Sequence, residues 1–267
     1  MSSQRPPNPK GWRTFVDRGG TFTDVVKVSP EGKVSFGKVR SDRAVVGQLA
    51  EGDLVFGTTV ATNALLEGER LACLLIVSEG FSDLVHIGDM SRPDLFDAFK
   101  RRPKPLCEEV LEVPGRVAAD GSERAEIPDS FLEKLAAMDF SAYQSVAIAL
   151  LNSHRNPRHE EAVAACLPEF LHVCLGHQLS PEVDYLARIE TTLVDASITP
   201  LLRDAMQRDQ IPDDALAMRS DGSLCAAEEL RAPDAVLSGP AGGVLAVEAV
   251  AQQAGFERAV GLDMGGT

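Results

Sequence analysis

The stretch Asp17–Asp24 (DRGGTFTD) decides the fold class of this chain. It follows Thr14–Val16, a short apolar segment that favours β-structure, and it runs into a second apolar segment, Val25–Val28. A strand, a glycine turn and a second strand are therefore predicted, and the turn Ser29–Gly32 leads to a third strand over 33–39. Adjacent glycines let a backbone approach an anion closely and direct successive amides at it. The stretch predicts a phosphate-binding turn, and a plain tight hairpin is the alternative.

The same pattern returns near the other end of the chain as Asp263–Thr267 (DMGGT). Both copies come directly after apolar segments that read as strands, the second of them Ala259–Leu262. A plain hairpin has no reason to repeat an Asp, two glycines and a Thr in register, so the repeat favours two related halves that each contribute a phosphate turn. Because a strand and a turn bury too little surface to be stable alone, we expect this chain to be a fragment or a truncated product.

Two further segments place polar or glycine residues next to predicted helices. Gly57–Asn63 (GTTVATN) ends an apolar run, where α/β folds tend to bind ligands, so its hydroxyls and amide are candidates to orient a small polar substrate. A helix start capped by Thr62 or Asn63 is the alternative. Ser238–Gly243 (SGPAGG) directly precedes a predicted helix over Val244–Gln253, where free amides and the helix dipole favour an anion. Here the alternative is a simple helix N-cap.

Several common active-site motifs are missing from the sequence. No segment has the Lys-Ser/Thr ending of a P-loop, no Gly-x-Gly-x-x-Gly opens a strand–helix unit, and no Gly-x-Ser-x-Gly is present. The five histidines have no metal-binding spacing and are predicted to lie at the surface or in loops. The five cysteines form no Cys-x-x-Cys pair and are predicted to be buried free thiols. Arg92, in a charged cluster around Pro93, could clamp a carboxylate, although an exposed loop has the same composition.

The chain is acidic, with 26 Lys and Arg against 40 Asp and Glu and a formal net charge of −14. Nucleic acid and membrane surfaces are therefore not expected as partners, whereas a nucleotide can still be held by local amides and Mg2+. The polar, proline-rich residues 1–10 lack the apolar core of a signal peptide, and no apolar run has the length of a membrane span. We expect a cytoplasmic protein.

Strands and helices alternate along the chain, which predicts an α/β layered architecture. Two apolar runs, Leu71–Val77 and Val146–Leu151, read as buried strands. The remaining predicted elements are helices over Asp129–Met138 and Pro157–Leu167, a strand over His172–Leu175, helical stretches within Pro181–Met206, and a strand over Ala215–Arg219 that enters the hairpin turn Ser220–Ser223.

These motifs together resemble the N-terminal part of the hydantoinase A / 5-oxoprolinase family, whose members have the actin, Hsp70 and sugar-kinase (ribonuclease H-like) α/β fold. Arg18 and the run at Arg92 are more similar to 5-oxoprolinases than to hydantoinase A subunits. The resemblance implies a flexible tail over 1–13, an N-terminal domain over 14–210 and the start of a catalytic domain over 211–267. Its landmarks are DRGGTFTD (17–24), GTTVATNALLE (57–67), RPDLFD (92–97), SHRNP (153–157), LSGPAGG (237–243) and DMGGT (263–267).

The resemblance implies an activity and a set of site residues. ATP with Mg2+ phosphorylates the amide oxygen of 5-oxo-L-proline, and water opens the activated ring to L-glutamate, ADP and phosphate. Asp17 and Asp263 are the expected catalytic residues and hold Mg2+ directly or through water. The expected phosphate-binding residues are Gly19, Gly20, Thr21, Thr23, Asp24, Ser238, Gly239, Gly242, Gly243, Gly265, Gly266 and Thr267, and the expected substrate-side residues are Gly57, Thr58, Thr59, Thr62, Asn63 and Arg92.

The resemblance leaves alternatives open. A hydantoinase A or acetone carboxylase-like subunit has the same turns, and a non-catalytic interaction fragment retains the same first domain. A hydantoinase B-like domain or subunit is an expected partner, within a homo- or hetero-oligomer. Because the adenosine-binding region of the family is absent from this sequence, we expect little turnover by the chain alone.

Overall fold

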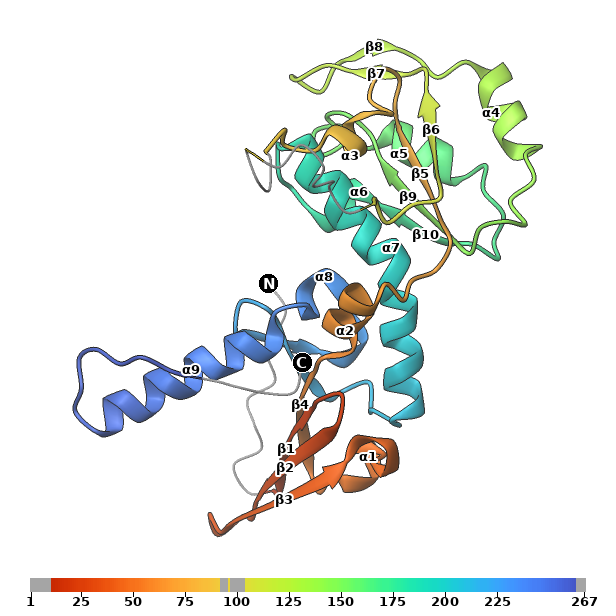
Figure 1. Ribbon diagram of the computed structural model, residues 1–267. Helices are drawn as coiled ribbons and strands as arrows, with labels where there is room; N and C mark the ends of the chain where they lie inside the picture. The colour runs from red at the N-terminus through yellow and green to blue at the C-terminus, as the bar shows by residue number, and fades with distance from the viewer. Residues whose placement is uncertain (1–10, 92–95, 97–103, 263–267) are drawn as a thin grey trace. The chain divides into compact units, whose positions relative to one another are not determined.

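The computed structural model describes residues 11–91, 96 and 104–262, which form two compact units (Figure 1). Unit 1 comprises Met1–Glu69 and Leu201–Thr267, and unit 2 comprises Arg70–Pro200. Arg92 and the second glycine turn, Asp263–Thr267, lie outside the described residues. The boundaries of these units differ from those of the domains expected from the sequence, 14–210 and 211–267. The expected domains remain a prediction.

Unit 1 is built on a six-stranded mixed sheet with the order β12-β11-β4-β1-β2-β3. The first three strands form an antiparallel meander, β4 and β11 add in parallel, and β12 closes a hairpin with β11. This arrangement confirms the predicted strand–glycine turn–strand and the hairpin at Ser220–Ser223. The strands are β1 (Arg13–Arg18), β2 (Phe22–Val28), β3 (Val34–Arg40), β4 (Asp53–Thr58), β11 (Leu216–Met218) and β12 (Leu224–Ala226).

Alternation along β1 gives the sheet of unit 1 one buried and one open face. Thr14 and Val16 are buried, whereas Phe15 and Asp17 are exposed. The helices and short 3-10 turns of unit 1 are η1 (Ser41–Arg43), α1 (Val46–Leu49), α2 (Val60–Glu67), the last turns of α7 (Tyr185–Arg208), η2 (Ala227–Glu229), α8 (Ala232–Ala235) and α9 (Ser238–Gln253).

Two sequence predictions in the last part of unit 1 were wrong. The helix predicted to begin at Val244 begins at Ser238, so the segment Ser238–Gly243 forms the first turns of α9 and is not a loop before it. Pro240 is tolerated there because the first N–H groups of a helix have no intrahelical partner. The strand predicted over Ala259–Leu262 is irregular chain with exposed side chains; among the described residues no strand pairs with it, and an unpaired strand is not stable.

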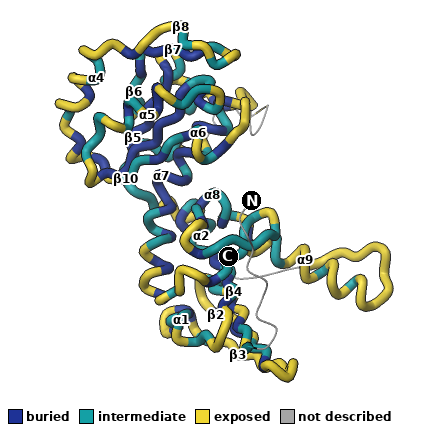
Figure 2. The backbone as a smooth tube through the Cα atoms, turned by 180° about the vertical axis from the view of Figure 1, so that it is seen from behind, coloured by how far each residue is buried: buried dark blue, intermediate teal, exposed yellow. Residues whose placement is uncertain are grey.

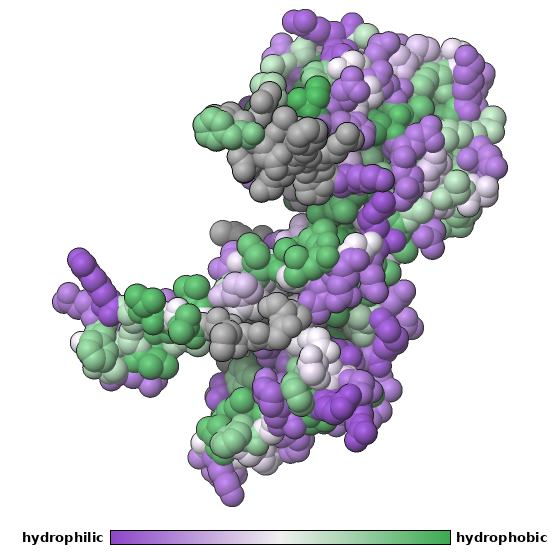
Figure 3. All heavy atoms as spheres, viewed as in Figure 1, coloured by the Kyte–Doolittle hydropathy of each residue, from purple (hydrophilic) through white to green (hydrophobic). Residues whose placement is uncertain are grey.

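Most residues of helix α9 are exposed (Figure 2). Val244, Leu245 and Val250 are 68%, 43% and 65% exposed, and hydrophobic residues cover much of the helix in Figure 3. The span Ala232–Gln253 is long and apolar enough to cross a membrane by length and composition, with a mean hydropathy of 1.3. However, this span is divided between α8 and α9, and Ala232, Ala235 and Ser238 are buried within unit 1.

Unit 2 contains a four-stranded parallel sheet with the order β10-β9-β5-β6 and a separate hairpin of β7 and β8. The predicted strands and helices of this region are confirmed, and the helical stretches within Pro181–Met206 form one helix, α7. The elements are β5 (Cys73–Ser78), α3 (Leu84–Ile87), β6 (Glu109–Val113), β7 (Arg116–Val117), β8 (Glu123–Ala125), α4 (Asp129–Ala136), β9 (Ser145–Ala149), α5 (Arg158–Ala164), β10 (His172–Leu175) and α6 (Gly176–Leu179).

The central strands of unit 2 are buried on both faces, which explains their continuous apolar sequences. Every residue of β5 and β9 is buried. Leu74, Ile76 and Ile148 belong to a cluster with α4 and α5, whereas Leu75 and Val77 pack with Ile189 and Leu193 of α7 on the other face. The five cysteines are free thiols, with Cys73 and Cys174 buried and the other three partly buried, which largely confirms the sequence prediction.

A buried polar network lies where β5 and β9 of unit 2 end. Arg188 of α7 is 0% exposed and donates to Leu150 O (3.0 Å) and Glu182 O (2.6 Å), and Nη1 also lies 3.4 Å from His154 Nδ1. Burial raises the pKa of Tyr185 to about 12, so its hydroxyl stays protonated and donates to Ala149 O (2.8 Å). Burial also lowers the pKa of His154, with the charges of Arg188 and Arg155 adding to the effect.

The lowered pKa of His154 predicts an acid-sensitive contribution to the stability of unit 2. Because the folded pKa lies below the unfolded value of about 6.5, His154 stabilises the fold fully above that pH, and this contribution is lost as the pH falls toward the folded pKa. We expect His154→Asn to reduce the loss of stability between neutral and mildly acidic pH, measured by hydrogen exchange of β9 amides. The exposed His86→Asn is the control, and an unchanged pH profile in His154→Asn would contradict this role.

Candidate functional site

Parallel pairing of β1 with β4 brings two of the sequence motifs together in unit 1. Asp17 is in register with Gly57, and Arg18 with Thr58, so the DRGG turn and the GTTVATN turn leave the same edge of the sheet. Thr59 fastens the two turns, because both its amide (3.1 Å) and its hydroxyl (3.3 Å) donate to Arg18 O. Carboxyl ends of adjacent parallel strands are where α/β sheets place ligands.

The N-terminus of α9 reaches the same edge. Ser238 is 2% exposed and donates from Oγ to Thr58 O at 3.3 Å, and Thr62 donates from Oγ1 to Val236 O at 2.5 Å, just before the helix. The exposed Gly239 follows Ser238, in the first turn, where N–H groups are free to meet an anion.

Gly242 and Gly243 occupy a different position from the one the sequence suggested. They lie within α9, beyond the first turn, where amides donate along the helix and not to a ligand. Nothing lies within 4 Å of a Cβ built at either position, so both face open space in unit 1. Their predicted role as amide donors to phosphate is therefore corrected.

The end of β11 adds a third strand terminus beside the first two. Ala217 pairs with Phe56 of β4, and the chain then turns at Ser220. Ser220 donates from Oγ to Asp234 O (2.6 Å) and accepts from Leu237 N (3.0 Å), so this turn holds the approach to α9. Arg219 pairs with Asp234 at 2.7 Å and reinforces the same junction.

The β1–β2 turn presents its tip to solvent. The Gly19 amide donates to Phe22 O at 3.0 Å, which leaves the exposed tip residues Gly20 and Thr21 to meet a ligand. A Cβ at Gly19 would lie 3.0 Å from Phe22 O, tighter than side chains normally approach a backbone oxygen, so glycine is favoured there. This geometry suits a turn that binds an anion through backbone amides.

Asp17 and Asp24 occupy the open face of the sheet, paired across β1 and β2. Asp17 is exposed and lies beside Gly57, where a Cβ would be 3.4 Å from Asp17 Oδ1, so the glycine leaves space around this carboxylate. Asp24 pairs with Lys38 of β3 at 2.8 Å, about one strand further from β4. Asp17 is thus the carboxylate that the fold brings next to the converging turns.

Thr23 supports the turn from its buried side. It is 0% exposed and its Oγ1 lies 3.0 Å from Ser41 Oγ, which donates to Gly19 O at 2.7 Å. The predicted contact between the Thr23 hydroxyl and a phosphate is therefore corrected: alternation along β2 turns this side chain away from the open face. Ser41 was missed in the sequence because no local motif links it to a turn 22 residues away.

The substrate-side candidates Thr58, Thr59, Thr62 and Asn63 are tied into the fold of unit 1. Thr58 Oγ1 accepts from Val60 N (3.2 Å), and Asn63 Nδ2 donates to Thr59 Oγ1 (3.3 Å). Helix α2 begins at Val60 with Thr59 at the N-cap position, so neither Thr62 nor Asn63 caps it as the alternative interpretation suggested. Their described hydrogen bonds hold β4, α2 and the start of α9 in place.

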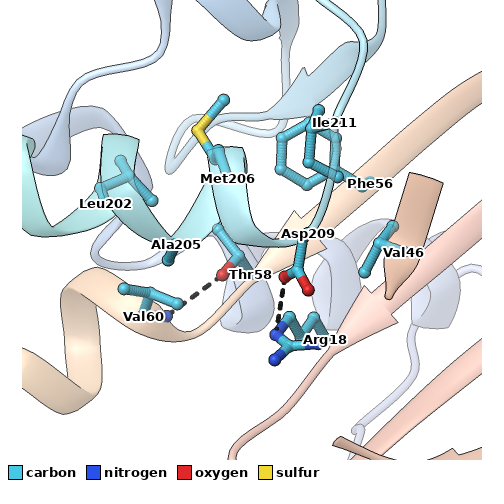
Figure 4. Close-up of a pocket in the computed structure, with 10 residues that line it drawn as sticks. All are labelled: Arg18, Val46, Phe56, Thr58, Val60, Leu202, Ala205, Met206, Asp209 and Ile211. Carbon is cyan, nitrogen blue, oxygen red and sulfur yellow. Dashed lines mark hydrogen bonds and ion pairs between the residues drawn. The ribbon is translucent and has the colours of Figure 1, made fainter. Parts of the chain in front are cut away.

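A small cavity of about 10 Å³, the size of one water molecule, lies beneath the turn (Figure 4). Arg18 points into it and pairs through Nε with Asp209 Oδ2 at 2.9 Å, while its Nη atoms donate to Ala44 O and Ser41 O, both at 3.3 Å. Burial raises the pKa of Asp209, and the Arg18 charge opposes that shift. Asp209 was missed because its partnership with Arg18 spans most of the chain.

Loss of the Arg18 guanidinium is expected to destabilise unit 1. In Arg18→Met the carboxylate of Asp209, 8% exposed, would remain buried without its ion pair, which should lower the free energy of unfolding by about 2 kcal/mol. Urea unfolding followed by the fluorescence of Trp12, the single tryptophan, reports on this unit.

The exposed pair Arg40–Asp42 supplies the control, because Arg40→Met should change stability by less than about 1 kcal/mol. The double variant Arg18→Met/Asp209→Leu should recover most of the loss, since it removes the unpaired charge. Equal losses in the free energy of unfolding of Arg18→Met and Arg40→Met would contradict a stabilising role of the Arg18–Asp209 ion pair.

Family profiles match most of the chain. Residues 13–171 match the profile described as the hydantoinase/oxoprolinase N-terminal region, and residues 188–267 match the one described as hydantoinase/oxoprolinase. The sequence is 33% identical to 5-oxoprolinase 1 of Arabidopsis thaliana, with 96% of this chain and 25% of that protein covered. It is 31% identical to caprolactamase subunit alpha of Pseudomonas jessenii, with 96% and 42% covered. The chain thus spans a quarter to two fifths of these relatives.

Solved structures agree on the fold. The crystal structure of the ATP-dependent caprolactamase from Pseudomonas jessenii superposes with a TM-score of 0.80 at 28% identity, covering 96% of this chain and 42% of that one. Nucleotide-free acetone carboxylase superposes with a TM-score of 0.76 at 19% identity, covering 91% and 41%, and shows the fold alone. The architecture is the α/β fold of the actin and sugar-kinase type. With both profiles matched in sequence order, the chain belongs to the hydantoinase/oxoprolinase family.

Proposed function

We propose that this chain supplies a phosphate-binding end of an ATP-dependent enzyme that opens a cyclic amide, with 5-oxo-L-proline as substrate. One observation carries the proposal: the β1–β2 turn, the β4–α2 turn and the N-terminus of α9 meet at one edge of the sheet of unit 1. Backbone amides and a helix N-terminus together form the kind of site that binds phosphate groups in an otherwise acidic protein.

Asp17 is the proposed Mg2+ residue. Mg2+ prefers one or two carboxylates together with retained waters and phosphate oxygens, and an exposed carboxylate beside a glycine offers that combination. When bound, Mg2+ would neutralise charge on the transferring phosphate. Asp263, Gly265, Gly266 and Thr267 of the second turn stay part of the proposal by sequence alone, because they lie outside the described residues.

The chemistry explains why ATP is needed to open a lactam. An amide carbonyl is a poor electrophile; its oxygen therefore attacks the γ-phosphorus of ATP, and ADP leaves. Water adds to the carbon of the phosphorylated amide, and the ring C–N bond breaks as the nitrogen takes up a proton, which leaves an acyl phosphate. A second water molecule hydrolyses this acyl phosphate to a carboxylate and phosphate. Positioning and charge neutralisation by the turns would supply most of the catalysis, as in other phosphoryl transfers.

The names of the relatives support a lactam substrate and differ in its size. Caprolactamase and 5-oxoprolinase both name cyclic amides, so caprolactam is a second candidate substrate for the same reaction. Arg18, which suggested the 5-oxoprolinase subgroup from the sequence, pairs with Asp209 beneath the turn. Arg18 is therefore proposed to support the turn from beneath and not to bind the substrate.

Amide-dependent release of phosphate from ATP tests the function. We propose a cytoplasmic assembly of this chain with a hydantoinase B-like subunit. Both the chain alone and this assembly would be assayed with 5-oxoproline, caprolactam and hydantoin. We expect stimulation by 5-oxoproline in the assembly and little turnover by the chain alone. Stimulation by hydantoin only would favour a hydantoinase A subunit, and no stimulation by any amide, with intact phosphate binding, would favour an interaction fragment.

A further inference from the structure

A cluster of three metal-ligating side chains lies within unit 2. His172 and Cys174 are two residues apart in β10, so alternation directs both side chains to the same face of the sheet. That face packs against α7, which contributes Asp195. This group was not predicted from the sequence, because its ligands come from a strand and a helix about 20 residues apart and no short motif contains them all.

The ligand atoms are close enough to share one ion. Cys174 Sγ lies 3.3 Å from His172 Nε2 and 3.0 Å from Asp195 Oδ2, and all three ligand atoms lie within 4.8 Å of one another. In a tetrahedral zinc site with bonds of about 2.0–2.3 Å, neighbouring ligand atoms are about 3.3–3.6 Å apart. Only small side-chain movements would therefore seat an ion among them.

A neighbouring hydroxyl orients one ligand of the cluster, as hydrogen bonds around the ligands do in known metal sites. Thr199, one helical turn after Asp195, donates from Oγ1 to Asp195 Oδ1 at 2.6 Å, which leaves Oδ2 directed at Cys174. A hydroxyl or carboxylate that fixes a ligand in this way commonly strengthens metal binding. Cys174 and Asp195 are 3% and 1% exposed, whereas His172 is partly exposed and provides a route of entry.

We propose that His172, Cys174 and Asp195 bind a zinc-class transition-metal ion that fastens β10 to α7. One nitrogen, one sulfur and one oxygen ligand suit Zn2+ and disfavour Mg2+, which prefers oxygen ligands alone. On binding, the thiol proton of Cys174 leaves to solvent, the thiolate and the Asp195 carboxylate bind the ion, and His172 binds through the lone pair of Nε2. A water molecule completes the fourth position. The competing interpretation is a hydrogen-bonded core cluster in which the thiol proton stays between Cys174 and Asp195.

Metal uptake by the chelator-treated chain separates the two interpretations. Titration with Co2+ should give a thiolate-to-cobalt charge-transfer band and the visible bands of tetrahedral cobalt at one equivalent, and Zn2+ should displace it. We expect Cys174→Ser to abolish the charge-transfer band, Asp195→Asn to weaken binding about 100-fold, and Thr199→Val to weaken it about 10-fold. Cys166→Ser is the matched control, because Cys166 donates to Ala162 O in α5, outside the cluster.

A measurement on the unchanged chain avoids any dependence on variants that fail to fold. Zn2+ should slow alkylation of Cys174, but not of Cys166, when both are followed by mass spectrometry. Absence of metal uptake, or equal uptake by the chain and Cys174→Ser, would overturn the proposal and leave the hydrogen-bonded cluster. Protection of Cys166 to the same extent as Cys174 would also overturn it.

Discussion

Replacement of Gly47 by alanine is expected to lower the free energy of unfolding of unit 1 by about 3 kcal/mol. A Cβ at this position would lie 2.0 Å from Gln210 O and 3.1 Å from Asp209 O, which are backbone atoms that cannot move as a flexible side chain can. The Gly47 amide also donates to Asp209 O at 2.8 Å, so a displaced α1 would release the end of α7 that holds Asp209 under the turn. Trp12 fluorescence during urea unfolding measures the loss.

Gly37→Ala is the matched control for this prediction. Gly37 lies on the exposed edge strand β3, with nothing within 4 Å of an added Cβ, so its replacement should change stability by less than about 0.5 kcal/mol. Equal stability of the two variants would show that Gly47 of α1 does not pack closely against the backbone of Asp209 and Gln210.

Asp17→Asn is expected to reduce amide-dependent ATP hydrolysis at least about 100-fold in the assembled enzyme, because Mg2+ would lose its proposed carboxylate ligand. Asn has nearly the same shape as Asp, and Asp17 lies exposed at the end of β1, so the fold should not change. The rate at saturating ATP and amide measures the effect, and urea unfolding checks the fold.

Asp120→Asn serves as the control for charge. Asp120 lies in an exposed loop of unit 2, where Ser122 donates to it from both its amide (2.9 Å) and its hydroxyl (2.6 Å), and its replacement should leave the rate unchanged. Full activity of Asp17→Asn would exclude the proposed role of this carboxylate.

Most strands of both units were predictable from the sequence because their signals are local, whereas β6, β7 and β8 were not predicted. Apolar runs in β5 and β9, alternation in β1, and a glycine turn between β1 and β2 each specify one element within a few residues. The helix start at Ser238 was missed because Gly239 and Pro240 read as breakers, although the first turn of a helix tolerates both.

The assembly of the site was less predictable because it depends on pairs distant in sequence. Asp17, Gly57 and Ser238 were separate candidates in the sequence. The parallel pairing of β1 with β4 and the hydrogen bond from Ser238 to Thr58 O bring them to one edge of the sheet. The ion pair of Arg18 with Asp209 has no local signature at all. For the same reason the histidines were predicted at the surface or in loops, whereas His159 is 5% exposed and His172 lies in a strand beside Cys174.

Titration of the isotope-labelled chain with MgATP and with pyrophosphate, followed by amide NMR, tests the central claim most directly because it needs neither turnover nor a partner. The claim is that the turns at the carboxyl ends of β1 and β4, with the start of α9, bind phosphate. We predict saturable shifts centred on Gly20, Thr21, Ser238 and Gly239, weakened in Asp17→Asn when Mg2+ is present. Saturable shifts centred elsewhere, or none at these four amides, would contradict the account.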